Sequence, residues 1–256
     1  MRNPPIPVIA VLGLGEAGGL IAAGLAEAGA LVRGYDPRVD APAGVTNCAS
    51  GAEACAGADL VLSVNSAADA PDALAEGMPG CAPGTLWADL NTASPGEKTS
   101  LAETARDRVR VVDVALMSPV PGRGLLTPMT VSGPAAADYA AVMRPLGARV
   151  DVLDGPVGSA ATHKLLRSVF YKGLAAAVLE ATAAARAAGL SDWVRGNITE
   201  ELIKADAATL DRLLTGSRTH AVRRIHEMEA AARLLDDLGV PARVTRASRD
   251  WLADLT

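Results

Sequence analysis

The sequence predicts an α/β fold, with a doubly wound, mostly parallel sheet followed by a smaller all-helical domain. Apolar strand-like runs alternate with helical segments over the first part of the chain, as expected where helices cover both faces of a parallel sheet. After Gly158 the alternation ends and only helical periodicity remains. We therefore expect one domain over residues 1–155 and a second over residues 156–256.

The expected elements follow from these runs. Strands are expected at residues 7–12, 30–35, 59–65, 85–88, 110–115, 127–132 and 149–153, and the helices between them at 16–28, 51–57, 68–77, 95–107 and 135–146. In the second domain, helices are expected at 159–188, 191–204, 206–214, 219–238 and 241–254, with Gly189, Gly216 and Gly239 as boundaries. The first of these helices carries a wide apolar stripe, which predicts a homodimer through the helical domain.

The first expected strand leads into the motif Gly13-Leu14-Gly15-Glu16-Ala17-Gly18. Gly13 permits a tight turn, Gly15 lets the backbone approach a pyrophosphate, and Gly18 lets the helix pack closely. Asp36 ends the second strand, where a carboxylate accepts hydrogen bonds from ribose hydroxyls. This order predicts a Rossmann-type dinucleotide site, although a glycine-rich turn that binds nothing also has this pattern.

Asp36 also bears on which dinucleotide is bound. A carboxylate at this position repels a ribose 2′-phosphate and so favours NAD. Arg33 and Arg38 lie close by in the sequence and could accommodate that phosphate, so NADP remains the alternative.

The start of the second domain carries the second informative motif, Gly158-Ser-Ala-Ala-Thr-His-Lys164. Ser168 follows Lys164 by four residues, so both side chains lie on one helix face. A partly desolvated lysine there can exchange a proton with an alcohol or carbonyl oxygen during hydride transfer. An ordinary solvated helix lysine is the competing interpretation.

Four segments resemble the β-hydroxyacid dehydrogenases, the superfamily of 6-phosphogluconate and 3-hydroxyisobutyrate dehydrogenases: VIAVLGLGEAGG, VLSVNSAAD, ADLNTASPGE and GSAATHKLLRS. The resemblance implies an NAD(P)-dependent oxidoreductase that moves a hydride between the nicotinamide and a small, acidic hydroxy or carbonyl substrate. Lys164 would be its general acid/base. Val64, Asn65, Asn91 and Thr92 would lie near the cofactor. The segments KLLRSVFYKGL and RRIHEMEAAARLLDDLGV resemble a branch with an uncharacterised helical C-terminal domain.

The chain also departs from this superfamily. The usual asparagine of the catalytic helix is Ser168, and the proton-donating glutamate of 6-phosphogluconate dehydrogenase is Tyr171. The substrate loop DAPVSGG is replaced by DVALMSP, which leaves Ser118 and Pro119 as substrate-binding candidates. Further candidates are Arg223, Arg224 and His226, for an anionic substrate group. These three residues also fit a solvated helix face paired with Glu227 and Glu229.

Two other functions stay open. An imine reductase shares the domain plan; Lys164 counts against it, and Tyr171 is its possible proton donor. A non-catalytic protein that uses the dinucleotide to control its assembly is the other alternative, motivated by the altered substrate loop.

Composition narrows the remaining classes. The formal net charge of −5 gives no reason to expect nucleic-acid or membrane binding. The N-terminal MRNPPIP lacks the regions of a signal peptide. Cys48, Cys55 and Cys81 are expected to be reduced thiols without a metal, which favours a cytoplasmic protein. His163 and His220 are given no chemical role.

Overall fold

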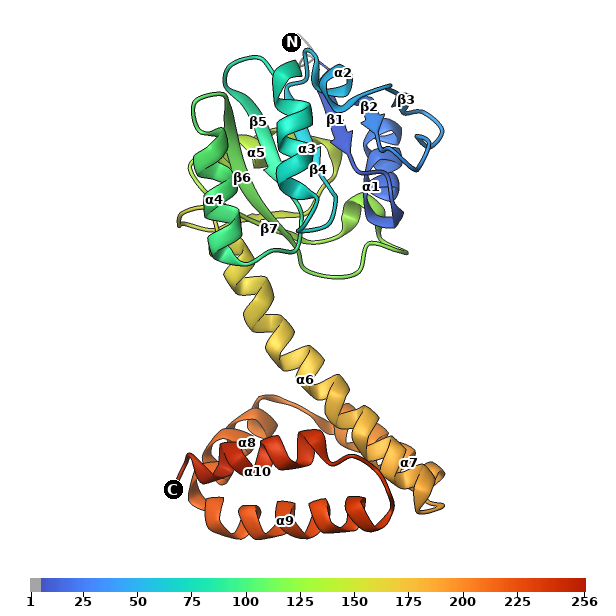
Figure 1. Ribbon diagram of the computed structural model, residues 1–256, viewed down its shortest axis with the longest axis vertical. Coiled ribbons are helices and arrows are strands. Elements are labelled where there is room, and N and C mark those ends of the chain that lie inside the picture. The colour runs from blue at the N-terminus through green and yellow to red at the C-terminus, as the bar shows by residue number, and fades with distance from the viewer. Residues whose placement is uncertain (1–5) are drawn as a thin grey trace. The chain divides into compact units, whose positions relative to one another are not determined.

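A computed structural model describes residues 6–256, and its first part is built on one eight-stranded sheet (Figure 1). The strand order is β3-β2-β1-β4-β5-β6-β7-β8, and the neighbouring strands pair in parallel except β6 with β7. The strands are β1 (Val8–Leu12), β2 (Leu31–Tyr35), β3 (Thr46–Asn47), β4 (Leu60–Ser63), β5 (Thr85–Asp89), β6 (Val109–Leu116), β7 (Met129–Ser132) and β8 (Val150–Val152). The predicted fold class is confirmed. The expectation for the extreme N-terminus falls largely on residues 1–5, outside the described range.

Five α-helices connect these strands: α1 (Glu16–Glu27), α2 (Gly51–Cys55), α3 (Ala70–Gly77), α4 (Pro95–Ala105) and α5 (Ala136–Met143). Short 3₁₀ turns lie at Met78–Gly80, Gly124–Leu126 and Arg144–Leu146. Strand β3 was not predicted, because its two residues are both exposed and carry no apolar signal. It pairs with β2 through Arg33 opposite Thr46 and Gly34 opposite Asn47.

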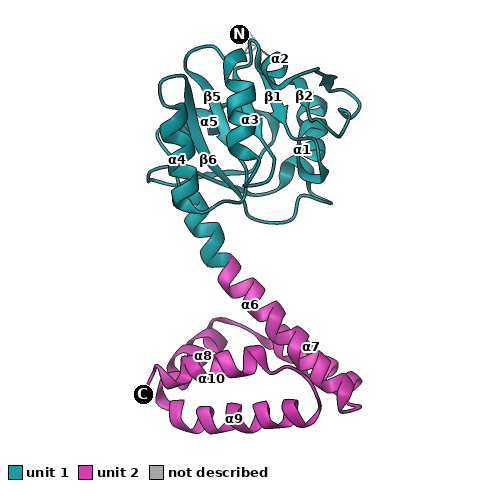
Figure 2. Cartoon of the chain, viewed as in Figure 1, with its two compact units in different colours: residues 1–167 teal, residues 168–256 magenta. Residues whose placement is uncertain are grey.

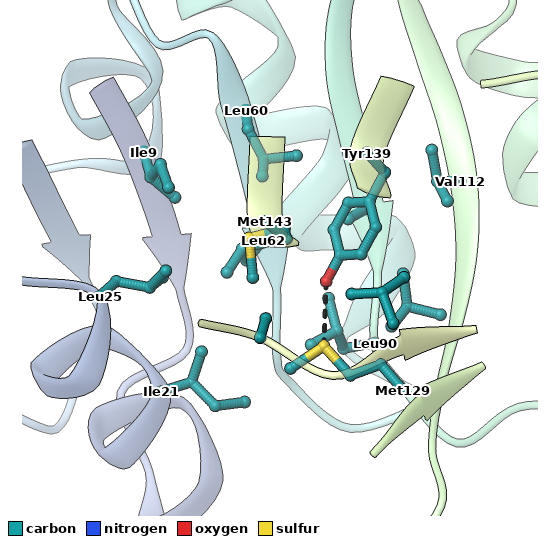
Figure 3. Packing of buried hydrophobic residues seen from close by; sticks show 14 of the residues in the cluster. Ile9, Ile21, Leu25, Leu60, Leu62, Leu90, Val112, Met129, Tyr139 and Met143 are labelled. Carbon is teal, nitrogen blue, oxygen red and sulfur yellow. Dashed lines mark hydrogen bonds between the residues drawn. The ribbon is translucent and has the colours of Figure 1, made fainter. Parts of the chain in front are cut away.

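Alternation along the strands gives the sheet two apolar cores. Ile9 and Val11 of β1 point to the face covered by α1 and α5, whereas Ala10 and Leu12 point to the face covered by α2, α3 and α4. On the first face, the fully buried Tyr139 of α5 donates a hydrogen bond to Met129 Sδ at 3.2 Å (Figure 3). Burial raises the pKa of Tyr139, so its hydroxyl remains a donor there.

The rest of the chain is helical: α6 (Ser159–Ala187), α7 (Ser191–Lys204), α8 (Ala207–Thr219), α9 (Ala221–Asp237) and α10 (Arg243–Ala253). Two compact units divide within α6, after Arg167 (Figure 2). Gly216 was expected to end a helix but lies inside α8; a Cβ there would lie 3.3 Å from Arg224 Nη2, so glycine makes room for that arginine. No helix in the described part of the chain is long and apolar enough to span a membrane.

One acidic side chain ties the second unit together. Glu180 of α6 accepts hydrogen bonds from the amides of Val244 and Thr245, at 2.8 and 2.7 Å, and from the Thr245 hydroxyl at 2.6 Å. Partial burial acts to raise the pKa of Glu180, but the hydrogen bonds from Thr245 and Val244 outweigh it and hold that pKa below its usual value. Glu180 thereby satisfies the first amides of α10, which helix geometry leaves without partners.

Candidate functional site

The turn after β1 has the geometry that its glycines predict. Gly13 has a φ of +93°, and a Cβ there would lie 2.6 Å from Asn65 Oδ1. A Cβ on Gly18 would overlap the carbonyl oxygen of Gly13. Only glycine fits at these two positions, and together they let α1 begin directly against the end of β1.

The outer side of the same turn is open. Apart from the two neighbouring residues of the chain, no described residue has an atom within 4 Å of a Cβ placed on Gly15, and no described side chain caps α1 there. The first helical residues, Glu16 and Ala17, therefore offer amides that no side chain occupies. A helix N-terminus of this kind, next to free space, fits the pyrophosphate of a dinucleotide.

Asp36, directly after β2, is tied to this turn. Its Oδ2 accepts the amide N–H of Leu14 at 2.9 Å, and its Oδ1 accepts that of Arg38 at 2.8 Å. The sequence assigned this carboxylate to ribose binding alone, and the structure adds a role in shaping the turn. Oδ1 also accepts the amide of Val39 at 3.2 Å, so the acceptor capacity that remains for a ribose hydroxyl lies on Oδ2.

A cavity of about 280 Å³ adjoins these residues. Its lining includes four residues predicted to bind the cofactor, Gly13, Asp36, Arg38 and Asn65. Its acidic lining residues are Asp36, Asp69, Asp72 and Glu76. A hydrogen bond with the Glu76 carboxylate holds the pKa of Tyr35, another lining residue, above its ordinary value. Carboxylates thus outnumber the Arg38 guanidinium around this cavity.

The segments after β4 and β5 are joined by side-chain amides. Asn91, almost fully buried, accepts the backbone N–H of Asn65 on its Oδ1 and donates from Nδ2 to Ser63 Oγ at 3.1 Å. Ser63 Oγ also accepts from Asn65 Nδ2 at 3.0 Å. These bonds hold Val64 and Asn65 against Gly13, so two predicted cofactor residues are placed by a third, Asn91.

Lys164 lies on the first turns of α6 and reaches the segment after β5. Its Nζ donates a hydrogen bond to Thr92 Oγ1 at 2.8 Å, and Lys164 is half-buried. Lys164, Thr92 and Asn91 border a narrow gap, too small to hold a water molecule, together with Asp113 and Lys98. The structure therefore brings the predicted general acid/base next to two predicted cofactor residues that lie more than seventy positions away in the sequence.

Sequence reasoning missed a buried ionic cluster beside Asn91 and Thr92. Lys98 Nζ lies 3.0 Å from Asp89 Oδ2 and 3.3 Å from Asp113 Oδ1, with all three side chains at most 2% exposed. Lys98 falls in the segment GEKTS, which reads as a solvated helix face. The available signal was a pair of aspartates, each at or near the end of an apolar strand, since parallel strands bring such ends to one edge of the sheet.

The substrate-binding candidates of the altered loop are placed differently. Ser118 and Pro119 follow β6 and are not among the residues that border the narrow gap at Lys164. Ser118 Oγ is buried and has no hydrogen-bond partner among the described residues. Their role in substrate binding remains a prediction.

The other candidates belong to the second unit, and three of them have local contacts. Arg223 forms an ion pair with Glu227 at 3.1 Å, as the alternative interpretation of a paired helix face expected. Arg224 donates to Ser217 Oγ at 2.6 Å, and the Tyr171 ring lies edge-on to Phe170 with 5.1 Å between centroids. For Ser168, Tyr171, Arg223, Arg224 and His226 a place in the site remains a prediction.

Comparison with protein families finds one match in each of the two units of the chain. Residues 8–124 match the NAD binding domain of 6-phosphogluconate dehydrogenase. Residues 185–255 match a domain of unknown function, DUF1932. The two matches agree with the predicted NAD-binding domain and with the predicted branch that has an uncharacterised helical C-terminal domain.

Two individual proteins are similar to this chain in sequence. An uncharacterized 28.5 kDa protein in the 7S RNA 5′ region of Methanothermus fervidus is 29% identical over 143 residues, 56% of this chain and 55% of that protein. The match thus spans about half the length of that relative. A conserved hypothetical protein from Sinorhizobium meliloti 1021 is 29% identical with a TM-score of 0.63, covering 97% of this chain and 88% of that one.

A third neighbour is similar in fold alone. The V8 variant of an imine reductase from Myxococcus stipitatus, in complex with NAD+, has a TM-score of 0.80 at 18% identity, over 98% of this chain and 93% of that chain.

Proposed function

We propose that this chain, whose residues 8–124 match the NAD binding domain of 6-phosphogluconate dehydrogenase, is an oxidoreductase that reduces or oxidises a small hydroxy/carbonyl substrate that carries an acidic group. The observation that carries this proposal is the hydrogen bond from Lys164 Nζ to Thr92 Oγ1 at 2.8 Å. It places a proton-carrying amine beside the segment after β5, at the carboxyl edge of the sheet where ligands of such folds bind.

Lys164 has the chemistry that the reaction needs. A nicotinamide cofactor, when bound, would supply or accept the hydride. As the hydride leaves or reaches the substrate carbon, the oxygen on that carbon must lose or gain a proton. Lys164 takes up this proton as the neutral amine in oxidation and delivers it as the ammonium in reduction. Thr92 holds the amine in place between turnovers.

We propose NAD rather than NADP as the preferred cofactor. Asp36, Asp69, Asp72 and Glu76 surround the cavity at the end of β2, against the guanidinium of Arg38. Their summed negative charge repels a 2′-phosphate more strongly than Arg38 attracts it. Removal of negative charge from this cavity would shift the preference toward NADPH.

We propose that the protein is a homodimer assembled through its helical unit. Helices α7 and α8 have no buried residue in the described chain. Their large apolar side chains are mostly exposed, among them Ile203 at 79% and Trp193 at 67%. A second copy offers the same apolar faces, and a two-fold pairing would cover both sets.

The three free cysteines support a cytoplasmic location.

The test begins with cofactor binding. Calorimetric titration with NADH and NADPH is run on the wild type and on Asp36→Asn, which keeps an acceptor for the Leu14 amide and removes the charge. We expect the wild type to bind NADH more tightly and the variant to lose much of that preference. Failure of the wild type to bind either cofactor would overturn the proposal.

The second stage tests the lysine. NADH oxidation is measured with keto acids, aldehydes and cyclic imines on the wild type, Lys164→Ala, and the control Lys172→Ala, an exposed lysine of the same helix. Lys164→Ala should lower kcat by about 10²–10⁴-fold, the usual contribution of a general acid/base, without weakening NADH binding. Full turnover by Lys164→Ala would remove that role, and turnover restricted to the imines would make the protein an imine reductase.

A further inference from the structure

The cluster of Asp89, Lys98 and Asp113 contains two carboxylates and one ammonium. All three are shielded from solvent, and Lys98 Nζ also donates to the Asp89 carbonyl oxygen at 2.7 Å. Taking such groups out of water is costly, and an apolar trio of similar volume would often be as stable. One ammonium cannot occupy every acceptor position of two carboxylates. The other hydrogen bonds that these carboxylates accept therefore show which segments of the chain the cluster holds in place.

Asp113 holds the beginning of α6. Its Oδ2 accepts the backbone N–H groups of Gly158 at 3.1 Å and Ala161 at 2.9 Å. Ser132 Oγ donates to the same oxygen at 3.3 Å and accepts the amide of Ala160 at 3.0 Å. A buried carboxylate from β6 and a hydroxyl from β7 thus satisfy amides that helix geometry leaves without partners, with the negative charge at the favourable end of the helix.

Asp89 holds the segment that follows β5. Its Oδ1 accepts the backbone N–H of Asn91 at 3.1 Å and Asn91 Nδ2 at 2.6 Å. Thr92, the acceptor for Lys164, is the next residue. Lys164 follows Ala161 by three residues, about 4.5 Å along a helix. The two carboxylates therefore anchor both partners of the Lys164–Thr92 hydrogen bond within a few residues, and Lys98 joins the two anchors.

We propose that Lys98 and Asp113 are positioning residues for Lys164. Lys98 clamps the two carboxylates together, Asp113 fixes the start of α6, and Asp89 fixes the segment of Thr92, so that the Lys164 amine is held at one place on the carboxyl edge of the sheet. The inference deepens the proposed function and rests on it, because it assigns these residues an effect on proton transfer that they exert through Lys164.

The first test needs no substrate. The rate of acetylation of Lys164 by a trace of acetic anhydride is measured by peptide mass spectrometry, relative to that of Lys172 in the same molecule. In Asp113→Asn and Ser132→Ala we expect the ratio to rise by about threefold or more, because both changes remove hydrogen bonds that hold the start of α6, and Asp113→Asn also removes a buried negative charge near the amine. Hydrogen exchange of the amides at 158–164 should accelerate in parallel.

Lys98→Met leaves two carboxylates buried without their cation, and it can fail to fold for that reason. The double variant Lys98→Met/Asp113→Asn removes one of these charges and serves in its place. An unchanged labelling ratio in the folded variants would overturn the inference. A general rise at all lysines would also overturn it, because it would indicate loosening of the whole domain.

The second test links the cluster to turnover. Asp113→Asn should lower kcat by about tenfold with KM and NADH affinity unchanged, and should cause no further loss when added to Lys164→Ala, since coupled residues are not additive. Equal fold-losses in both backgrounds would show a general structural effect and overturn the inference. Changed labelling with no turnover of any substrate would overturn the proposed function and leave the mechanical link intact.

Discussion

The two units of this chain bury their side chains to very different degrees. The first unit packs large apolar residues such as Trp87, Ile9 and Leu60 on both faces of its sheet, all of them fully buried. The second unit has one small buried cluster, Ala232, Leu235 and Ala242, in the part of the chain that the structure describes. The first unit has the core of an independent domain, whereas the helices of the second leave many large apolar side chains exposed.

Replacement of the same residue type in each unit tests this contrast most strongly. Trp87→Ala empties a fully buried site and should lower the free energy of unfolding by about 3–5 kcal/mol. Trp251, 73% exposed in α10, is the matched control, and Trp251→Ala should change stability by less than about 0.5 kcal/mol. Urea unfolding followed by circular dichroism measures both. Equal losses would show that the second unit is as tightly packed as the first.

A charge on the exposed apolar face of α8 should break the assembly. Leu213 is 56% exposed, and Leu213→Glu should raise the dimer dissociation constant at least about tenfold, or 1.4 kcal/mol. Leu126→Glu, at a 59% exposed leucine of the first unit, should leave it unchanged. Sedimentation velocity over a range of concentrations gives both values. A stable wild-type monomer at all concentrations would refute the proposed homodimer.

The smallest expected effect concerns Glu180, which accepts hydrogen bonds from the first amides of α10 in the second unit. Because the folded-state pKa of Glu180 is lowered from 4.5, its stabilising contribution is present above pH 4.5 and is lost as the pH falls through the folded value. Glu180→Gln should cost about 1 kcal/mol at neutral pH and flatten this acid-side loss. Thermal unfolding between pH 3 and 7 measures it, with the exposed Glu201→Gln as control. An unchanged acid-side slope in Glu180→Gln would contradict this account.

The glycine motif carried most of what the sequence could predict. Gly13 and Gly18 are required by close backbone approaches, so their positions alone indicate the strand, the turn and the helix. The mostly parallel sheet and most positions of the strands and helices were predicted from the apolar runs of the sequence.

Lys98 shows what the sequence could not reveal. It looks like a surface lysine among its neighbours, and only the register of β5 with β6, which pairs Asp89 with Asp113, surrounds it with carboxylates. Long-range pairing of this kind leaves no local signal. For the same reason, the contact between Lys164 and Thr92 was expected only from a family resemblance and from the place where α6 begins.

Asp36 has two roles, and this has a consequence for how the cofactor preference of such a protein changes in evolution. Its carboxylate accepts the Leu14 amide of the glycine turn as well as facing the cavity at the end of β2. A lineage that switches toward a phosphorylated dinucleotide by discarding the charge also weakens the turn, unless the new residue, like asparagine, keeps an acceptor for the Leu14 amide. Selection at this position therefore acts on cofactor preference and on the shape of the turn together, and it favours replacements that preserve that acceptor.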